Sequence, residues 1–264
     1  MIIALGLEYD GSGFSGWQSQ PGVATVQDRL EAALSRVADH PVKVHCAGRT
    51  DTGVHAVGQV VHFESDAARS PRAWVLGANV NLPPGISVIW AQAVAPGFHA
   101  RFSALSRRYR YIILNRWVRP AVLRARVTWQ RKPLDETRMQ QAAAHLLGEH
   151  DFTSFRALAC QSKSATRNVY QLNVSRAADY VYIDIHANGF LYHMVRNIAG
   201  VLMSIGAGER PPAWAAELLS SRDRVQGGVT APPDGLYLVH VTYPARFDLP
   251  SRYTPPCYAE ASVR

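Results

Sequence analysis

The sequence predicts an α+β protein made of two tandem ferredoxin-like halves, each with the element order β-α-β-β-α-β. The prediction rests on strand and helix patterns that occur in the same order twice along the 264 residues. It also rests on a balance of 47% hydrophobic and 18% charged residues, which is typical of globular domains. This order gives mainly antiparallel sheets with helices on one face. We expect an N-terminal half at 1–100, a C-terminal half at 101–250 and a tail at 251–264.

The first half contains four predicted strands, at 2–9, 42–47, 57–64 and 86–94. Thr25 begins a helix with an acidic residue three positions later, as in a capping box. A second helix begins at Ser70, where proline follows in the first helical position. The first helix has one apolar face at helical spacing, formed by Val26, Leu30, Ala33, Leu34 and Val37.

The second half repeats the order. A helix is predicted from Asp135 to Gly148, a longer one at about 190–205, and a short additional one at 212–220. The strands are predicted at 106–114, 167–175, 179–186 and 236–243.

The charge of the chain indicates an anionic partner. Twenty-eight basic residues against twenty acidic ones give a formal net charge of +8, and nucleic acid is the first candidate for such a protein. Residues 101–132 contain ten basic side chains and no acidic one. Within this run, Arg107, Arg108 and Arg110 interleave with Tyr109 and Tyr111 on a predicted strand, an arrangement that suits an RNA backbone and a stacked base.

The cysteines and the N-terminus favour a cytoplasmic protein. Three widely spaced cysteines form no Cys-x-x-Cys pair, which argues against a disulfide scaffold or a zinc ribbon. The N-terminal residues do not have the pattern of a signal peptide, and no apolar run is long enough for a membrane span.

Asp51, in the stretch GRTDTGVH at 48–55, has four interpretations. An aspartic peptidase needs two paired carboxylates and an all-β fold, whereas the chain has one Asp-Thr-Gly and several predicted helices. The aspartate could instead cap a turn in which Gly53 has positive φ. It could also be a nucleophile held ionised by a neighbouring basic group such as Arg49. A metal site is a further reading, although its spacing matches no common pattern; it would use His45, Cys46, Asp51, His55 and His62.

Five segments, in this order, resemble the tRNA pseudouridine synthase A family from the first strand to about residue 250. They read GRTDTGVHA, HARFSALSRRYRYII, DFTSFRA, FLYHMVRNIAG and GLYLVHVTYP. Thr52 departs from the family, in which alanine is commoner at this position. The resemblance implies an enzyme that isomerises uridine to pseudouridine at positions 38, 39 and 40 of the tRNA anticodon stem-loop. It also implies a homodimer that uses no cofactor and no metal, with a central active-site cleft between the halves of each chain.

The resemblance assigns roles to individual residues. Asp51 would be the nucleophile and Arg49 would fill the gap left by the flipped base. Tyr109 would stack on the uracil, Arg196 would pair with Asp51 and hold it charged, and Leu236 would wall the pocket. The arginines of the strand, Arg107, Arg108 and Arg110, would contact the RNA backbone. The alternative is a ferredoxin-like RNA-binding protein without chemistry, which has no need of Asp51.

Overall fold

The computed structural model describes residues 1–251 and 253–259 and divides the chain into two compact units. The first unit contains Met1–Ser106 and Tyr237–Pro255, and the second contains Arg107–Leu236 and the chain from Pro256 on. The sequence pattern placed the division after residue 100 and the strand at 236–243 in the second half. That strand lies with the first unit from Tyr237 on, because Tyr237 and Leu238 pair in parallel with His55 and Ala56.

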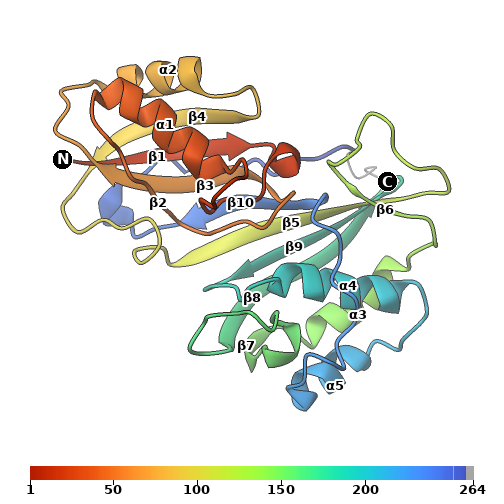
Figure 1. The fold of residues 1–264 in the computed structure, drawn as a ribbon. Helices are drawn as coiled ribbons and strands as arrows, with labels where there is room; N and C mark the ends of the chain where they lie inside the picture. The colour runs from red at the N-terminus through yellow and green to blue at the C-terminus, as the bar shows by residue number, and fades with distance from the viewer. Residues whose placement is uncertain (252, 260–264) are drawn as a thin grey trace. The chain divides into compact units, whose positions relative to one another are not determined.

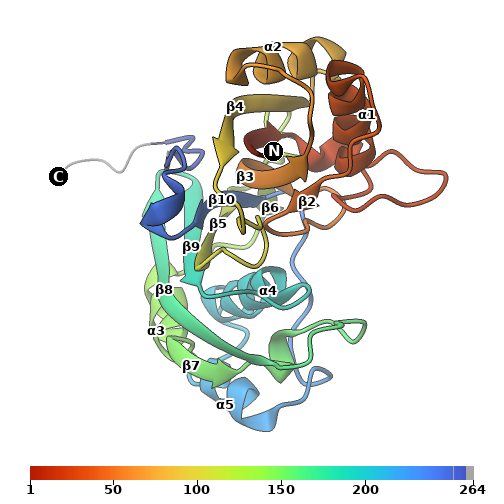
Figure 2. The ribbon, with the colours of Figure 1, turned by 90° about the vertical axis from the view of Figure 1, so that its left-hand side faces the viewer.

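The first unit has all six predicted elements in the predicted order (Figures 1 and 2). Its central strand β1 pairs antiparallel with β3 on one side and β4 on the other, and β2 pairs antiparallel with β3. This strand arrangement is that of a ferredoxin-like unit. The elements are β1 (Ile2–Tyr9), α1 (Val26–Ala38), β2 (His45–Cys46), β3 (His55–Glu64), α2 (Pro71–Asn81) and β4 (Ile86–Val94), joined by β10 (Leu236–Thr242) and two short 3₁₀ turns, η1 (Gly11–Gly13) and η3 (Ala245–Phe247).

Both helices of the first unit begin at the residues that the sequence indicates. The Thr25 side chain accepts a hydrogen bond from the backbone N–H of Asp28, and Ser70 accepts one from that of Ala73. These bonds satisfy backbone donors that a helix start leaves without a partner. The predicted apolar face of α1 is buried except for Val37, which is half-buried.

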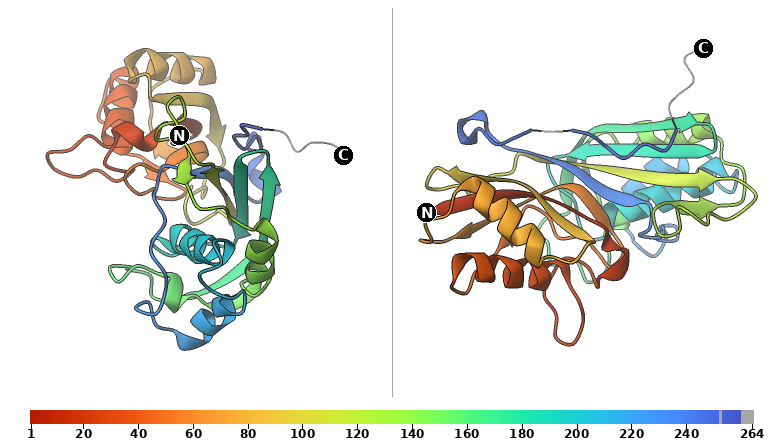
Figure 3. Two further views of the ribbon diagram at one scale, coloured as in Figure 1. Left: turned by 90° about the vertical axis from the view of Figure 1, so that its right-hand side faces the viewer. Right: turned by 90° about the horizontal axis from the view of Figure 1, so that it is seen from above.

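The second unit is also mainly antiparallel, with strand order β5-β9-β8-β7 and β6 parallel to β5. Figure 3 shows the long twisted strands β8 and β9, in teal. Helix α3 packs against β8 and α4. The elements are β5 (Ser106–Asn115), β6 (Thr128–Gln130), α3 (Glu136–Ala144), β7 (Gly148–Asp151), η2 (Thr153–Phe155), β8 (Thr166–Ala177), β9 (Tyr180–Ala187), α4 (Met194–Gly206) and α5 (Trp214–Ser221).

Several predicted bounds are wrong by a few residues; the helix predicted from about 190, for example, begins at Met194. The predicted strand at 42–47 is reduced to His45–Cys46, which pair with His62 and Val61 of β3. The helix predicted from Asp135 ends at Ala144 rather than at Gly148, which has φ 91° and begins β7. The α+β class with mainly antiparallel sheets is confirmed. Within the described ranges, no helix has the length and apolar character to cross a membrane.

Candidate active site

Asp51 is half-buried in the loop that joins β2 to β3, and its neighbours fix the backbone on both sides. The hydroxyl groups of Thr50 and Tyr9 are 2.8 Å apart and share a hydrogen bond. The Thr50 carbonyl accepts a bond from the N–H of Trp17 at 3.0 Å, and the Asp51 carbonyl accepts one from Val54 at 3.1 Å. Thr50 is therefore held by contacts with segments far away in the sequence, and Asp51 itself by a local turn.

Two glycines allow a second backbone segment to approach this loop. A Cβ on Gly16 would lie 2.8 Å from the Thr50 carbonyl oxygen and 3.2 Å from the Asp51 carbonyl carbon. A Cβ on Gly11 would lie only 2.0 Å from the carbonyl oxygen of Val54. Gly16 also has φ 84°, which favours glycine. Larger residues at these positions would push directly on the loop.

A buried glutamine supports the same loop. The Gln59 amide group donates hydrogen bonds to the Gly48 carbonyl at 2.7 Å and to the Tyr9 hydroxyl at 3.3 Å. Sequence reasoning missed both Gln59 and Tyr9. Gln59 could have been found as the one amide side chain in the predicted strand at 57–64, because a buried amide requires hydrogen-bond partners.

His55, which follows the loop, has a structural environment. Its buried ring stacks on the Tyr237 ring with centroids 4.7 Å apart. Its Nδ1 lies 3.1 Å from the backbone nitrogen of Gly11, which donates to it, and 3.2 Å from a carboxylate oxygen of Asp10. The ring thus joins the first residue of β3 to the turn after β1.

The metal-site interpretation of the sequence requires His55 to lie with His45 and His62, but in the structure His55 has other neighbours. The His62 ring lies 5.1 Å from that of His45 and 4.5 Å from that of His99, whereas His55 contacts other residues. In the part of the chain that the structure describes, no three His, Cys, Asp or Glu side chains are grouped to hold a metal ion. Burial, followed by the two neighbouring histidines, lowers the pKa of His62 to about 4.

Arg49 is exposed beside the loop. Burial disfavours the reactive thiolate form of the nearby Cys46. The Arg49 charge favours the thiolate of Cys46, but burial dominates and raises the pKa of this thiol to about 12. Because nucleophilic attack by cysteine requires the thiolate, Asp51 and not Cys46 is the nucleophile candidate of this loop.

Strand β5 of the second unit sends its tyrosines to the buried side. Tyr109 is 8% exposed and makes an edge-to-face contact with Phe190, with ring centroids 5.0 Å apart. The Tyr111 hydroxyl shares a hydrogen bond of 2.6 Å with Thr128 and donates to the Pro232 carbonyl. Burial raises the pKa of Tyr111 far above its usual value. Tyr111 therefore belongs to the core.

The three arginines of β5 have partners within the second unit. Arg110 forms a bidentate ion pair with Asp184, with N–O distances of 2.7 and 2.8 Å, and its guanidinium lies over the Tyr182 ring. Arg107 donates to the Asn188 carbonyl and Arg108 to the Gln171 side chain; these bonds measure 3.3 and 3.0 Å. The charge of Arg110 is thus balanced by a carboxylate.

Arg196 and Leu236 each form a hydrogen bond to a residue of the segment 231–233 in the second unit. Arg196 lies in the first turn of α4, and its Nε donates to the Ala231 carbonyl at 2.8 Å. The Ala231 N–H in turn donates to the Arg196 carbonyl at 3.1 Å. Leu236 is buried, and its N–H bonds to the Pro233 carbonyl at 2.8 Å. Asp51 and Arg49 belong to the first unit, whereas Tyr109, Arg196 and Leu236 lie in residues 107–236.

His193 precedes α4 with φ 62°, a left-handed conformation that costs a non-glycine residue energy. Its ring contacts the Tyr192 ring at 4.0 Å between centroids. Nothing in the sequence indicated this conformation.

Comparison with known proteins identifies the family to which the chain belongs. The sequence model of the tRNA pseudouridine synthase family matches residues 7–103 and 142–244. Three relatives are each named tRNA pseudouridine synthase A. The Nitrosococcus oceani protein is 64% identical over 250 residues, covering 95% of this chain and 96% of its own. The Methylococcus capsulatus protein is 59% identical, covering 94% and 92%, and the Photorhabdus laumondii protein is 58% identical, covering 98% of each. The chain belongs to the tRNA pseudouridine synthase family.

Proposed function

We propose that this protein isomerises uridine to pseudouridine in tRNA, at positions 38, 39 and 40 of the anticodon stem-loop, with Asp51 as the nucleophile. Full-length similarity to relatives named tRNA pseudouridine synthase A supports the reaction. The observation that carries the choice of nucleophile is the fixed loop. The backbone around Asp51 is hydrogen-bonded, while the residue stays half-exposed.

The proposed reaction has four steps. The target nucleotide leaves the stacked stem and enters the site, as enzymes acting on bases within helices require. The Asp51 carboxylate then attacks the ribose C1′ or the base C6. The bond between N1 and C1′ breaks, the uracil rotates, and C5 bonds to C1′. The bond that Asp51 formed to C1′ or C6 breaks and frees the carboxylate, while C5 loses its proton and N1 takes one up, so the product is an isomer of the substrate.

The other residues position the substrate and the nucleophile in this proposal. Tyr109 stacks on the flipped uracil and is placed to take the C5 proton, and its contact with Phe190 supports this ring orientation. Leu236 walls the uracil pocket. Arg49, exposed beside the loop, fills the place that the base leaves in the stem.

Arg196 is proposed to keep Asp51 ionised. An adjacent guanidinium favours the charged form of a carboxylate, and the bond from Arg196 Nε to Ala231 holds this side chain in place. Arg196→Lys retains the charge but not the planar fork, whereas Arg196→Met removes both. We expect Met to reduce turnover more than Lys at pH 7, with the difference decreasing as pH rises.

The RNA backbone would contact Arg107 and Arg108, with Arg110 contributing a guanidinium that Asp184 already balances. The proposal includes a homodimer acting in the cytoplasm, as the family resemblance implies. Sedimentation of the purified protein tests the dimer, since a single species of about 29 kDa, the mass of one chain, would contradict it.

Mapping of pseudouridine in an unmodified tRNA transcript tests the reaction. Wild-type protein should produce carbodiimide-dependent stops in primer extension at uridines in the 38–40 region and nowhere else. Replacing these uridines by cytidine in the transcript is the matched control, and should remove the stops. Binding of tRNA without any such product would instead favour an RNA-binding protein without chemistry.

A further inference from the structure

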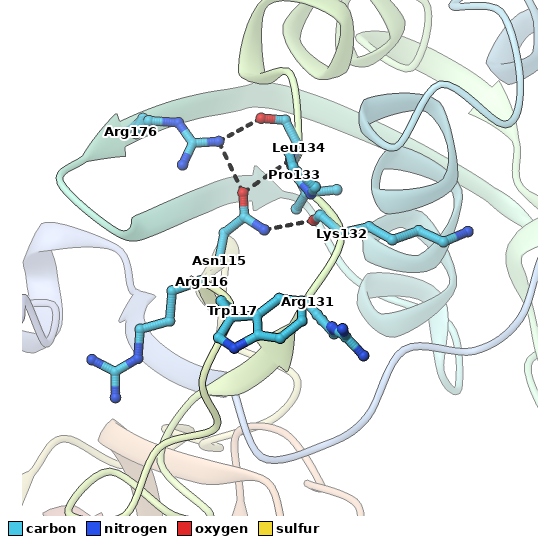
Figure 4. A pocket seen from close by; sticks show the side chains of 8 residues that line it. All are labelled: Asn115, Arg116, Trp117, Arg131, Lys132, Pro133, Leu134 and Arg176. Atoms are coloured by element: carbon cyan, nitrogen blue, oxygen red, sulfur yellow. Dashed lines mark hydrogen bonds between the residues drawn. The ribbon is translucent and has the colours of Figure 1, made fainter.

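The second unit contains a pocket at a place to which the proposed reaction gives no role. It has a volume of about 850 Å³ and lies where β5 ends and the chain enters the 116–126 loop. Figure 4 shows its lining, which includes Asn115, Arg116, Trp117, Arg131, Lys132 and Arg176. Four of these six side chains are basic and one is a tryptophan.

The pocket floor is a rigid hydrogen-bonded structure. The Asn115 amide group donates to the carbonyls of Gln130 and Lys132 at 3.0 and 2.7 Å. Its oxygen accepts bonds from the Leu134 N–H at 2.9 Å and from Arg176 at 3.2 Å. Because Asn115 uses both ends of its side chain, it fixes the strands and the loop that carry the pocket walls (Figure 4).

The positive charge of the pocket is only half balanced. Lys132 pairs with Glu209 at 2.6 Å, and Arg176 pairs with Glu136 at 2.8 Å. Arg116 is exposed and donates its Nε only to the Val118 carbonyl. Neither Arg116 nor Arg131 has a carboxylate partner among residues 1–251 and 253–259. An anionic ligand is therefore favoured at this end of the pocket.

The same end has an aromatic surface. The Trp117 side chain is 70% exposed, although it is one of the largest apolar groups of the chain. The Arg131 guanidinium lies 3.8 Å from the Trp117 ring centroid, which is within the range of a cation–π contact. The Trp129 indole nitrogen donates to the Arg116 carbonyl at 2.9 Å and steadies the loop. Aromatic rings next to arginines are the usual stacking surfaces for unpaired bases.

The basic residues of the acid-free run at 101–132 differ in whether they have partners. Those on strand β5 are engaged by partners, and Arg110 is neutralised by Asp184. Four of those that follow β5 in the chain are exposed and, within the described ranges, have no carboxylate partner. They are Arg116, Arg119, Arg124 and Arg131. Two of these four, Arg116 and Arg131, line the pocket together with Trp117.

We propose that the Trp117 pocket binds an unpaired nucleotide of the tRNA other than the target uridine. Its base would stack on Trp117 and its phosphate would lie between Arg116 and Arg131. The inference rests on tRNA being the substrate, as proposed above, but it uses none of the residues assigned to the reaction.

Substitution of Trp117 tests the stacking contact through the affinity for tRNA. Trp117→Ala should raise the Kd about tenfold, because stacking of one base contributes roughly 1–3 kcal/mol. Trp117→Phe keeps an aromatic face and should raise it by no more than about threefold. An unchanged Kd for the alanine variant would overturn the proposal. So would an equal loss for both variants, since the ring would then act through loop packing.

The salt dependence of tRNA binding tests the charged contacts of the pocket. The double variant Arg116→Gln, Arg131→Gln should reduce the slope of log Kd against log salt concentration by roughly 0.8, because one phosphate is no longer neutralised. Arg72→Gln is the matched control, because Arg72 is also exposed and without a carboxylate partner in the described chain. An equal slope change in the control, or none in the double variant, would refute the site. Failure of the proposed reaction can be distinguished from failure of this site, because wild-type protein would then bind tRNA and form no pseudouridine.

Discussion

Gly16 gives a direct way to move the nucleophile loop without altering a functional side chain. In Gly16→Ala, the new Cβ would lie 2.8 Å from the Thr50 carbonyl oxygen, where ordinary contacts begin at 3.4 Å, so the loop must shift by about 0.6 Å. Since a displacement of 1 Å costs roughly a hundredfold in rate, we expect kcat to fall about tenfold. The left-handed φ of 84° adds a loss of about 1 kcal/mol in the free energy of unfolding.

The assay is steady-state pseudouridine formation with saturating tRNA, together with the Kd for tRNA and urea unfolding. Gly22→Ala is the matched control, because Gly22 has a similar φ of 78° but no atom within 4 Å of the added Cβ. It should lose a similar stability and keep its kcat. A wild-type rate for Gly16→Ala, or an equal rate loss in the control, would refute the idea that this contact positions Asp51.

Three other predictions concern stability. Tyr9→Phe removes the hydroxyl that bonds to Thr50, and should lower the free energy of unfolding by about 1 kcal/mol in urea titrations. His62 should make stability depend on pH, because its pKa of about 4 is below the unfolded value of 6.5, so the unfolded chain binds more protons between them. The free energy of unfolding should therefore rise by about 3 kcal/mol from pH 4 to pH 6.5, and His62→Asn should flatten this rise. Arg110→Gln leaves Asp184 without its ion pair and should cost about 2 kcal/mol, part of which Asp184→Asn should restore.

The sequence predicted the local elements better than their long-range pairing. The strand at 86–94 has the predicted bounds, because its apolar residues lie between clear turn signals. The short strands β6 and β7 were missed, since three or four residues are too few for a period to be seen. The return of Tyr237 to pair with His55 depends on residues about 180 positions apart, a register that no local pattern encodes.

In the candidate active site, the residues with proposed chemical roles were likewise easier to predict than the residues that support them. Asp51 and Arg49 could be assigned from the sequence because they lie in the motif GRTDTGVHA, which resembles the tRNA pseudouridine synthase A family. The residues that hold the loop, Tyr9 and Gln59, look like ordinary strand positions until the hydrogen bonds are known. The pairing of Arg110 with Asp184 was likewise hidden, because it joins adjacent strands whose register the sequence does not reveal.

The most direct test of the central claim compares wild-type protein with Asp51→Asn, which keeps the size of the side chain and removes its charge. Both would be assayed for pseudouridine at positions 38–40 and for tRNA affinity under the same salt conditions. We predict that Asp51→Asn binds tRNA with nearly wild-type Kd and forms no pseudouridine. Product formation at the wild-type rate by this variant would contradict the assignment of Asp51 as the nucleophile.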